Sequence, residues 1–256
     1  MNRVALITGS TSGIGLGIAR HFAENQYNIM FHGLETNGLE IATQIGAKNN
    51  VEVAFSNANL MHSNQVEKLV EQTYNTFGRI DVLINNAGIQ YVSPIDKFPN
   101  EKYEAIIALN MNASFYASKA AWKYMKAQSF GRIINISSVH GLRASEYKTA
   151  YVTAKHGVIG MTKVLGLEGA PYNITCNAIC PGYVRTPLVE KQIPDQAKSH
   201  NMSEEDVITK VMLKKQAVKS FVPIEALADM ALLLSKESSS TITGTEFVLD
   251  GGWTAQ

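Results

Sequence analysis

Short apolar runs alternate along the chain with longer stretches in which apolar residues recur at helical spacing. Runs of this length are typical of buried strands, and the stretches between them are long enough for helices. The predicted strands are Val4–Ile7, Tyr27–Phe31, Val51–Phe55, Val82–Asn85, Arg132–Ser137, Thr175–Ile179 and Glu246–Leu249. The predicted helices fill most intervals and include Asn64–Phe77, Glu101–Met125, Ala150–Glu168 and Pro223–Leu234. The alternation is typical of βαβ units and predicts an α/β fold with a doubly wound parallel sheet of about seven strands.

One long connection breaks this alternation, over about residues 186–221. Within it, Ser203 and the acidic residues that follow are typical of a helix start, with a serine cap and negative charge in the first turn. A long connection at the carboxyl edge of a sheet is more often a lid than a structureless loop when it carries helical signals. We therefore expect a helical substrate lid here. Because no linker or repeat interrupts the chain, we expect a single domain over residues 1–256.

The composition is that of an ordinary globular enzyme, since 45% of the 256 residues are hydrophobic and 18% are charged. A net charge of +1 without a cluster of Lys and Arg argues against nucleic acid or a membrane as partner. The first apolar run is too short for a signal peptide, and no apolar segment reaches about 18 residues, so we expect a cytoplasmic protein. Cys176 and Cys180 lie four residues apart in a predicted strand, beyond disulfide reach. We interpret both as small core residues, and no metal site is expected.

The candidate chemistry centres on Tyr151 and Lys155. Of the ten tyrosines, only Tyr151 has a lysine four residues later, and on a helix this spacing places both side chains on one face. A nearby ammonium stabilises a tyrosinate, which predicts a pKa below the usual ~10 and a group that transfers protons near neutral pH. Taken alone, the pair is equally consistent with ordinary helix-surface residues. Ser138 changes that balance, because it ends a predicted buried strand at the sheet edge where ligands bind.

A glycine-rich turn follows the first predicted strand. Gly9 and Gly13 permit tight backbone geometry, Gly15 permits close packing, and the next helix would point its amino terminus at a pyrophosphate. The strict Gly-x-Gly-x-x-Gly fingerprint is absent, because the residue three after Gly15 is Ile18. Such a turn by itself is also consistent with a plain strand-to-helix connection.

Several motifs together resemble the classical short-chain dehydrogenase/reductase family over essentially the whole chain. They are Thr8-Gly9-Ser10-Thr11-Ser12-Gly13-Ile14-Gly15, Asn85-Asn86-Ala87-Gly88, Asn110, Ser138 with Tyr151 and Lys155, and Pro181-Gly182 followed by Thr186. The resemblance implies a Rossmann-type fold, a nicotinamide dinucleotide and a catalytic tetrad of Asn110, Ser138, Tyr151 and Lys155. It also implies that Lys155 holds the nicotinamide ribose, that Ser138 bonds the reacting oxygen, and that Asn110 positions a water in a proton relay.

The resemblance further implies which residues contact the cofactor. They are Gly9, Thr11, Ser12, Gly13, Ile14, Gly15, Leu34, Asn59, Leu60, Asn86, Ala87, Gly88, Tyr151, Lys155, Pro181, Gly182, Val184 and Thr186. A 2′-phosphate requires Arg or Lys near the end of the second strand, but none occurs between Gly33 and Ala47, and Glu35 would repel it. We therefore expect NAD rather than NADP. Leu34 and Asn59 stand where the family more often has aspartate, so the exact contacts there stay open.

Substrate identity is expected to depend on polar groups that the scaffold does not need. Gln90, His140, Lys148 and Gln192 lie on segments that converge on one pocket with Ser138 and Tyr151. They would supply several donors and up to two positive charges, which suits a carboxylate. This set, with Trp253 near the carboxyl end, resembles family members that oxidise (R)-3-hydroxybutyrate to acetoacetate. The methyl end would then meet Tyr183, Leu188 and Trp253, although Trp253 is equally consistent with interface packing, and Tyr183 replaces the tryptophan expected in that subgroup.

Two other functions stay open at this point. One is an NADPH-dependent reductase of 3-oxoacyl thioesters, which shares the fold and tetrad but needs a basic 2′-phosphate site that is absent here. The other is a non-catalytic nucleotide-binding scaffold, against which the intact tetrad argues. The resemblance also implies a homotetramer built through the long helices that carry Asn110 and Tyr151 and through the last strand. Phe115, Trp122 and Val158 are its candidate interface residues.

Overall fold

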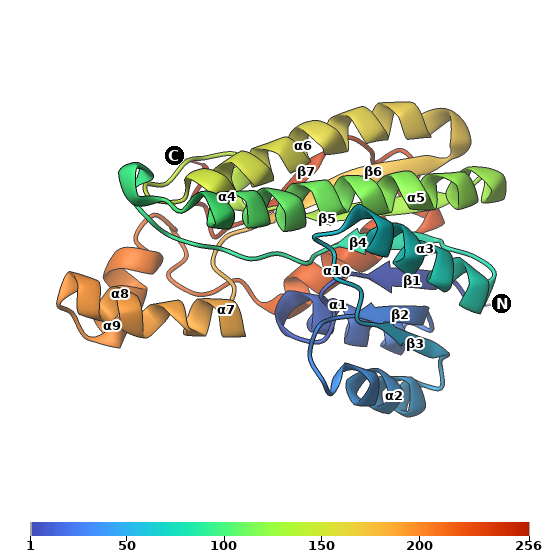
Figure 1. Cartoon of the computed structure of the whole chain (residues 1–256), viewed down its shortest axis with the longest axis horizontal. Coiled ribbons are helices and arrows are strands. Elements are labelled where there is room, and N and C mark those ends of the chain that lie inside the picture. The colour runs from blue at the N-terminus through green and yellow to red at the C-terminus, as the bar shows by residue number, and fades with distance from the viewer. Residues whose placement is uncertain (1, 256) are drawn as a thin grey trace.

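A sheet of parallel strands forms the centre of the molecule (Figure 1). The structure is a computed structural model and describes residues 2–255, apart from the side chains of residues 195, 199 and 200. Over these residues the sheet has seven strands, which are β1 (Val4–Ile7), β2 (Asn28–His32), β3 (Val53–Ser56), β4 (Val82–Asn85), β5 (Gly131–Ile136), β6 (Ile174–Pro181) and β7 (Glu246–Leu249). The predicted strands are all confirmed, with ends that differ by at most a few residues.

The order of the strands determines where a ligand can bind. It is β3-β2-β1-β4-β5-β6-β7, and the pairing between neighbours is parallel throughout. The chain moves outward from β1 to β3 and then crosses to the other side of β1, so the direction of winding reverses between β1 and β4. In open α/β sheets the crevice at the carboxyl ends of the strands, at this switch point, is the ligand site.

Helices cover both faces of the sheet (Figure 1). Those of the scaffold are α1 (Gly13–Glu24), α2 (Gly38–Asn49), α3 (Ser63–Phe77), α4 (Asn100–Ile107), α5 (Ala113–Gln128), α6 (Thr149–Gly169) and α10 (Ile224–Leu234). Helices α1, α2 and α10 pack on one face, and α3, α5 and α6 pack on the other. The arrangement is a single Rossmann-like domain, as predicted. Within the described residues, no helix is long and apolar enough to cross a membrane.

Burial on both faces explains the continuous apolar runs of the central strands. Every residue of β1, β4, β5 and β6 is buried, which is the pattern of a parallel sheet covered by helices on each side. Cys176 and Cys180 lie in β6 as free, buried thiols, and burial raises their pKa to about 12 and about 11. Both thiols therefore stay protonated near neutral pH and act as small core side chains.

One predicted helix is divided in the structure. The stretch predicted as Glu101–Met125 consists of α4, a π-helical turn η2 (Ala108–Asn112) and α5. A π-helical turn adds one residue to the helix and often marks a functional position, because it rotates a side chain out of the regular helical register. Asn110 lies in the middle of this turn.

The segment after β6 forms a small helical unit beyond the carboxyl ends of the strands (Figure 1). It contains α7 (Pro187–Glu190), α8 (Gln192–His200), α9 (Glu204–Val207) and the π-helical turn η5 (Ile208–Met212). Ser203 caps α9 by accepting a hydrogen bond from the backbone N–H of Asp206 at 3.2 Å, as the sequence predicts. Ile193, Val207 and Met212 form a small apolar core of its own. The helical content of this segment is as expected, and its action as a lid remains a proposal.

Candidate active site

A cavity of about 420 Å³ opens at the carboxyl ends of the strands, at the switch point of the sheet. It collects most of the residues that the sequence predicts to act in cofactor or substrate binding. Its lining includes Gly9, Thr11, Ser12, Gly13, Ile14, Leu34, Asn59, Leu60, Asn86, Ala87, Gly88, Gln90, Ser138, His140, Lys148, Tyr151, Lys155, Pro181, Gly182, Val184, Thr186, Gln192 and Trp253. Of the predicted set, only Gly15 and Asn110 are not among the lining residues. Both lie just behind the wall, Gly15 against Gly9 and Asn110 against Ile89.

The glycine-rich turn between β1 and α1 forms one end of the cavity. Gly9 and Gly13 adopt φ angles of +63° and +54°, a region that residues with a side chain rarely occupy. A Cβ on Gly15 would overlap the carbonyl oxygen of Gly9, so α1 can pack against the turn only with glycine at that position. The backbone N–H groups at the start of α1 are thereby left beside the cavity, which fits the pyrophosphate of a dinucleotide.

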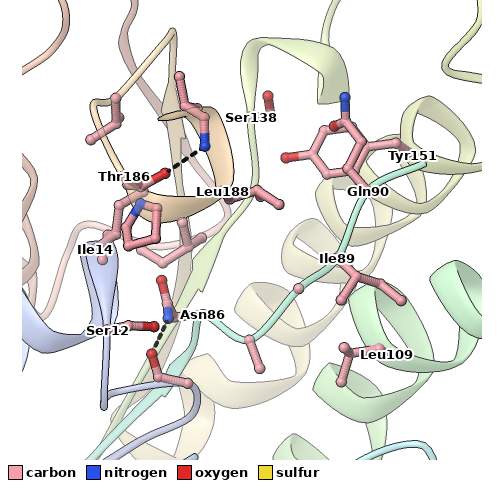
Figure 2. Close-up of a pocket in the computed structure, with 18 of the residues that line it drawn as sticks. Ser12, Ile14, Asn86, Ile89, Gln90, Leu109, Ser138, Tyr151, Thr186 and Leu188 are labelled. Atoms are coloured by element: carbon pink, nitrogen blue, oxygen red, sulfur yellow. Dashed lines mark hydrogen bonds between the residues drawn. The ribbon is translucent and has the colours of Figure 1, made fainter. Parts of the chain in front are cut away.

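Asn86 fastens this turn to the neighbouring strand. Its Nδ2 donates hydrogen bonds to the carbonyl oxygens of Thr8 and Gly9 at 2.9 and 3.0 Å. In return, Thr8 Oγ1 accepts hydrogen bonds from the backbone N–H groups of Asn86 and Ala87 at 2.9 and 3.1 Å. Figure 2 shows Asn86 beside Ser12 and Ile14 at this end of the pocket. These bonds hold the two strand ends in a fixed relation at the switch point.

His32 is a site residue that the sequence motifs do not predict. It ends β2, and its Nδ1 accepts a hydrogen bond from the backbone N–H of Gly9 at 3.0 Å. Its Nε2 lies 2.8 Å from the carbonyl oxygen of Ala58, which fixes the tautomer with the proton on Nε2. Burial lowers the pKa of His32, so the ring stays neutral and keeps its acceptor for Gly9. The sequence signal that could have identified His32 was its position as a polar residue at the carboxyl end of an otherwise apolar strand.

The other end of the turn contacts Glu35. The carboxylate of Glu35 accepts hydrogen bonds from Thr11 Oγ1 and, at 3.3 Å, from Ser12 Oγ. Burial opposes ionisation of Glu35, but these hydrogen bonds outweigh it and lower the pKa of the carboxyl below its usual value. A Cβ on Gly33 would overlap Thr11 Oγ1, so glycine is required for this contact. A negative charge is therefore fixed at the rim of the cavity, next to Leu34, whose side chain is 68% exposed.

Ser138, Tyr151 and Lys155 come together in the middle of the cavity, and Figure 2 shows the first two facing it beside Gln90. Ser138 follows the end of β5, and its side chain lies close enough to the hydroxyl of Tyr151 to favour the ionised form of the phenol. Tyr151 and Lys155 project from one face of α6, one turn apart. Lys155 is only 4% exposed, and its Nζ donates a hydrogen bond to the carbonyl oxygen of Ile136 at 2.7 Å. The hydroxyl of Tyr151 is thus a candidate proton-transfer group, with the hydroxyl of Ser138 and the ammonium of Lys155 nearby.

The expected lowering of the Tyr151 pKa is wrong for this structure. Burial raises the pKa of Tyr151 to about 12, and the hydrogen bond with Ser138 offsets only part of this effect. The physical reason is the position of Lys155, whose Nζ lies 5.6 Å from the centre of the Tyr151 ring and is bonded to Ile136. Burial also lowers the pKa of Lys155 to about 8. The phenol is therefore in its proton-donating form near neutral pH.

Asn110 acts on the wall of the cavity through Ile89. Its Oδ1 accepts a hydrogen bond from the backbone N–H of Ile89 at 2.9 Å, and its Nδ2 donates to the carbonyl oxygen of the same residue at 2.8 Å. Ile89 and Gln90 follow the Asn-Asn-Ala-Gly turn and both line the cavity. The side chain of Asn110 therefore fixes the loop that carries Gln90, and its part in a water relay stays a prediction.

The remaining wall is formed by His140, Lys148, Tyr183 and Trp253. Lys148 Nζ lies 3.3 Å from His140 Nε2 and 3.4 Å from the hydroxyl oxygen of Tyr183. Trp253 is 7% exposed, stacks on Tyr183 with ring centres 6.0 Å apart, and meets the edge of His140 at 5.4 Å. Trp253 is thus part of the cavity wall, which favours the substrate-site interpretation over interface packing.

Only one of the two expected positive charges is present on this wall. Burial and the charge of Lys148 lower the pKa of His140 to about 4, so its ring is neutral near neutral pH. Burial lowers the pKa of Lys148 to about 8, which leaves most of this side chain charged. Gln192 begins α8 and lines the cavity, and its Nε2 donates to the carbonyl oxygen of Leu188 at 3.0 Å. Within the described residues, no cluster of His, Cys, Asp and Glu suits a metal ion.

Comparison with known proteins agrees with this geometry. The family model described as short chain dehydrogenase matches residues 3–197, and the chain therefore belongs to the short chain dehydrogenase family of oxidoreductases. It is 46% identical to the D-beta-hydroxybutyrate dehydrogenase of Rhizobium meliloti (strain 1021) over 259 residues, which covers 100% of both chains. It is 42% identical to the D-beta-hydroxybutyrate dehydrogenase of Cupriavidus necator over 254 residues, 99% of this chain and 98% of that protein. A solved structure of a variant actinorhodin polyketide ketoreductase with NADPH superimposes with a TM-score of 0.93 at 29% identity, covering 100% and 98% of the two chains.

Proposed function

We propose that this protein oxidises (R)-3-hydroxybutyrate to acetoacetate with NAD in a reversible hydride transfer. The observation that carries the proposal is the ammonium of Lys148, which lines the same cavity as the Ser138–Tyr151 pair. Among the described residues, no carboxylate lies within ion-pair distance of this ammonium. A half-buried cation of this kind is stabilised by an anionic ligand. The two dehydrogenases of high identity bear names that agree with such a ligand.

In this reaction some residues of the cavity bind the ligands and others transfer the proton. A bound nicotinamide dinucleotide supplies the hydride acceptor for this chemistry. In oxidation, Tyr151 Oη takes the proton of the substrate hydroxyl, and Ser138 Oγ donates a hydrogen bond to the same substrate oxygen. Lys155 is the cation one helical turn from Tyr151, and its charge favours the tyrosinate that accepts this proton, although burial dominates the pKa of the phenol in the protein alone. In reduction, Tyr151 returns the proton to the forming hydroxyl.

The nearest alternative, reduction of a neutral 3-oxoacyl thioester, uses the same proton-transfer residues. A neutral thioester offers Lys148 no anionic partner, and leaving a partly buried ammonium unpaired is unfavourable in free energy. The decisive experiment measures turnover of 3-hydroxybutyrate, acetoacetate and acetoacetyl thioesters with NAD(H) and NADP(H). The proposal expects the highest kcat/KM for the free acids with NAD(H). A preference for the thioester would support the reductase, and no turnover with any pair would support a non-catalytic scaffold.

Cofactor preference is expected to depend on Glu35, whose fixed negative charge lies at the rim near Leu34. Like charges repel strongly at short range, so a 2′-phosphate in this region is disfavoured. Glu35→Arg is expected to raise kcat/KM for NADP about 10-fold or more, because repulsion is replaced by a charge-assisted bond. Steady-state kinetics with both cofactors measure the effect. Glu40→Arg makes the same charge change at an exposed position of α2 and serves as the control. Equal kcat/KM for NAD and NADP in the unmodified protein would contradict the assignment.

The expected homotetramer has support in apolar side chains exposed on the predicted interface elements. Phe115 on α5, one of the three predicted interface residues, is 46% exposed, and Leu167 on α6 and Val248 on β7, which were not among them, are 77% and 40% exposed. Of the other two candidates, Trp122 is partly buried and Val158 is buried, so Val158 lies beneath this surface. Light scattering at micromolar concentration is expected to give four times the 28.0 kDa mass of one chain. A monomer under these conditions would contradict the proposal.

A further inference from the structure

The hydroxyl of Tyr183 occupies an unexpected place in the cavity. From the sequence, Tyr183 is expected at the methyl end of the substrate, together with Leu188 and Trp253. In the structure, the hydroxyl oxygen of Tyr183 instead lies 3.4 Å from Lys148 Nζ, the cation assigned to the carboxylate end. A hydroxyl beside an ammonium is a polar feature, so this edge of Tyr183 does not suit a methyl group.

The position of Tyr183 is fixed by three separate contacts. Its backbone N–H donates to Gln216 Oε1 at 3.3 Å, and its carbonyl oxygen accepts from the backbone N–H of Val222 at 2.8 Å. Its ring stacks on Trp253 with an angle of 20° between the ring planes. Gln216 itself is 1% exposed. The hydroxyl is therefore positioned by contacts to both backbone polar groups of Tyr183 and to its ring.

His140 and Lys148 use most of their hydrogen-bonding groups on each other and on neighbouring residues. His140 Nδ1 lies 3.4 Å from the carbonyl oxygen of Arg143, which places the ring proton on Nδ1 and leaves Nε2 as an acceptor for Lys148. Lys148 has three N–H donors, and two of them point at His140 Nε2 and at the Tyr183 oxygen. One N–H of Lys148 is left for a ligand. In this state His140 orients Lys148 and has no donor of its own to offer.

The hydroxyl proton of Tyr183 is likewise left to bind a ligand. Because its oxygen accepts from Lys148, its O–H must point elsewhere, and within the described part of the chain no acceptor lies within hydrogen-bond distance of it. Tyr183 and Lys148 both line the cavity. The two remaining donors, one O–H and one N–H, are therefore adjacent and suit the two oxygens of a carboxylate.

We infer that the Tyr183 hydroxyl is a carboxylate-binding group that acts together with Lys148 as a two-donor clamp. The inference deepens the proposed function and rests on it for the identity of the substrate. It makes Tyr183 a specificity-determining residue for the acid end of the ligand. The methyl end is thereby left to Leu188 and to other apolar residues of the lid segment.

The test measures binding rather than turnover, so that it does not depend on catalysis. The probes are butyrate and its neutral amide, titrated calorimetrically into the full chain in the presence of saturating NAD. Tyr183→Phe keeps the ring that stacks on Trp253 and removes only the hydroxyl. It is expected to weaken butyrate binding about 10-fold and to leave butyramide binding unchanged, since a hydrogen bond to a charged group is lost. Tyr103→Phe removes an exposed hydroxyl on α4 and is the matched control.

A double-mutant cycle with Lys148→Ala shows whether Tyr183 and Lys148 bind the carboxylate together or affect butyrate binding independently. If both donors bind one carboxylate, the effect of Tyr183→Phe on the butyrate Kd becomes smaller once Lys148 is gone. An unchanged preference for butyrate over butyramide in Tyr183→Phe, or equal losses for both probes, would overturn the inference. Butyrate binding that depends on Tyr183 in a protein that does not oxidise 3-hydroxybutyrate would uphold the clamp and refute the proposed function. No preference for butyrate in the unmodified protein would refute both.

Discussion

Tyr151→Phe is expected to lower kcat for 3-hydroxybutyrate at least about 100-fold, the effect of losing a general acid–base group. The hydroxyl is the only part of Tyr151 that can take or give the proton, whereas the ring only fills space in the cavity wall. Cofactor binding should persist, because the glycine-rich turn and Asn86 are untouched by the change. Stopped-flow or steady-state kinetics give kcat, and fluorescence titration gives the cofactor Kd.

Lys155→Ala is the informative comparison for this result. Lys155 lines the cavity and holds the carbonyl oxygen of Ile136, so its loss should reduce both turnover and cofactor affinity. Tyr103→Phe again serves as the neutral control for a lost phenol. If Tyr151→Phe retained more than about a tenth of the original kcat, the assignment of the proton-transfer group would be wrong.

The pKa of Tyr151 also predicts how oxidation depends on pH. Burial raises the pKa of this phenol to about 12, so only a small fraction is present as the accepting tyrosinate near neutral pH. That fraction grows as the pH rises toward the pKa. Oxidation should therefore become faster with rising pH, whereas reduction uses the protonated phenol and needs no such change.

The fold could be predicted from the sequence because its signals are local. Each central strand is buried on both faces, so its sequence is an unbroken apolar run that needs no knowledge of its neighbours. The pairing of Tyr151 with Lys155 could also be predicted from the sequence, since residues four apart on a helix lie on the same face. The family motifs then placed the glycine-rich turn and the Asn-Asn-Ala-Gly turn at one edge of the sheet.

The features that escaped prediction depend on contacts between distant segments. The pKa of Tyr151 follows from how fully the folded chain encloses it and from the carbonyl of Ile136 that holds Lys155, and neither is visible in the spacing of the two residues. Likewise, His32 acts by bridging Gly9 and Ala58, which lie in separate loops. Periodicity cannot reveal such bonds, because they depend on which strand ends meet at the switch point.

The π-helical turn around Asn110 is a similar case. Its sequence continues the helical pattern of α4 and α5, so a single long helix was the natural expectation. The extra residue is tolerated because Asn110 forms two hydrogen bonds with the backbone of Ile89. Tertiary hydrogen bonds thus outweigh the local preference for a regular helix at this point.

Lys148→Ala is expected to raise KM for 3-hydroxybutyrate roughly 10- to 150-fold, which corresponds to the ~1.5–3 kcal/mol of a charge-assisted hydrogen bond. Its ammonium is the only charged group among the four residues of that wall near neutral pH, because His140 has a pKa of about 4. The methyl ester of the same acid lacks the charge and should show little change in KM. The ratio of KM values for acid and ester therefore isolates carboxylate recognition from damage to folding or to cofactor binding.

The same ratio should change with pH in the unmodified protein. Burial lowers the pKa of Lys148 to about 8, so the ammonium of the free protein is present below this value and is lost as the pH rises through it. Affinity for the acid should fall above about pH 8, whereas affinity for the ester should not, and the faster proton transfer to Tyr151 at high pH affects both substrates alike. Lys191→Ala removes an exposed lysine next to Gln192 and should leave the ratio and its pH dependence unchanged. If Lys148→Ala left the acid-to-ester ratio unaltered, the cavity would not recognise a carboxylate, and a thioester or a neutral alcohol would become the better candidate substrate.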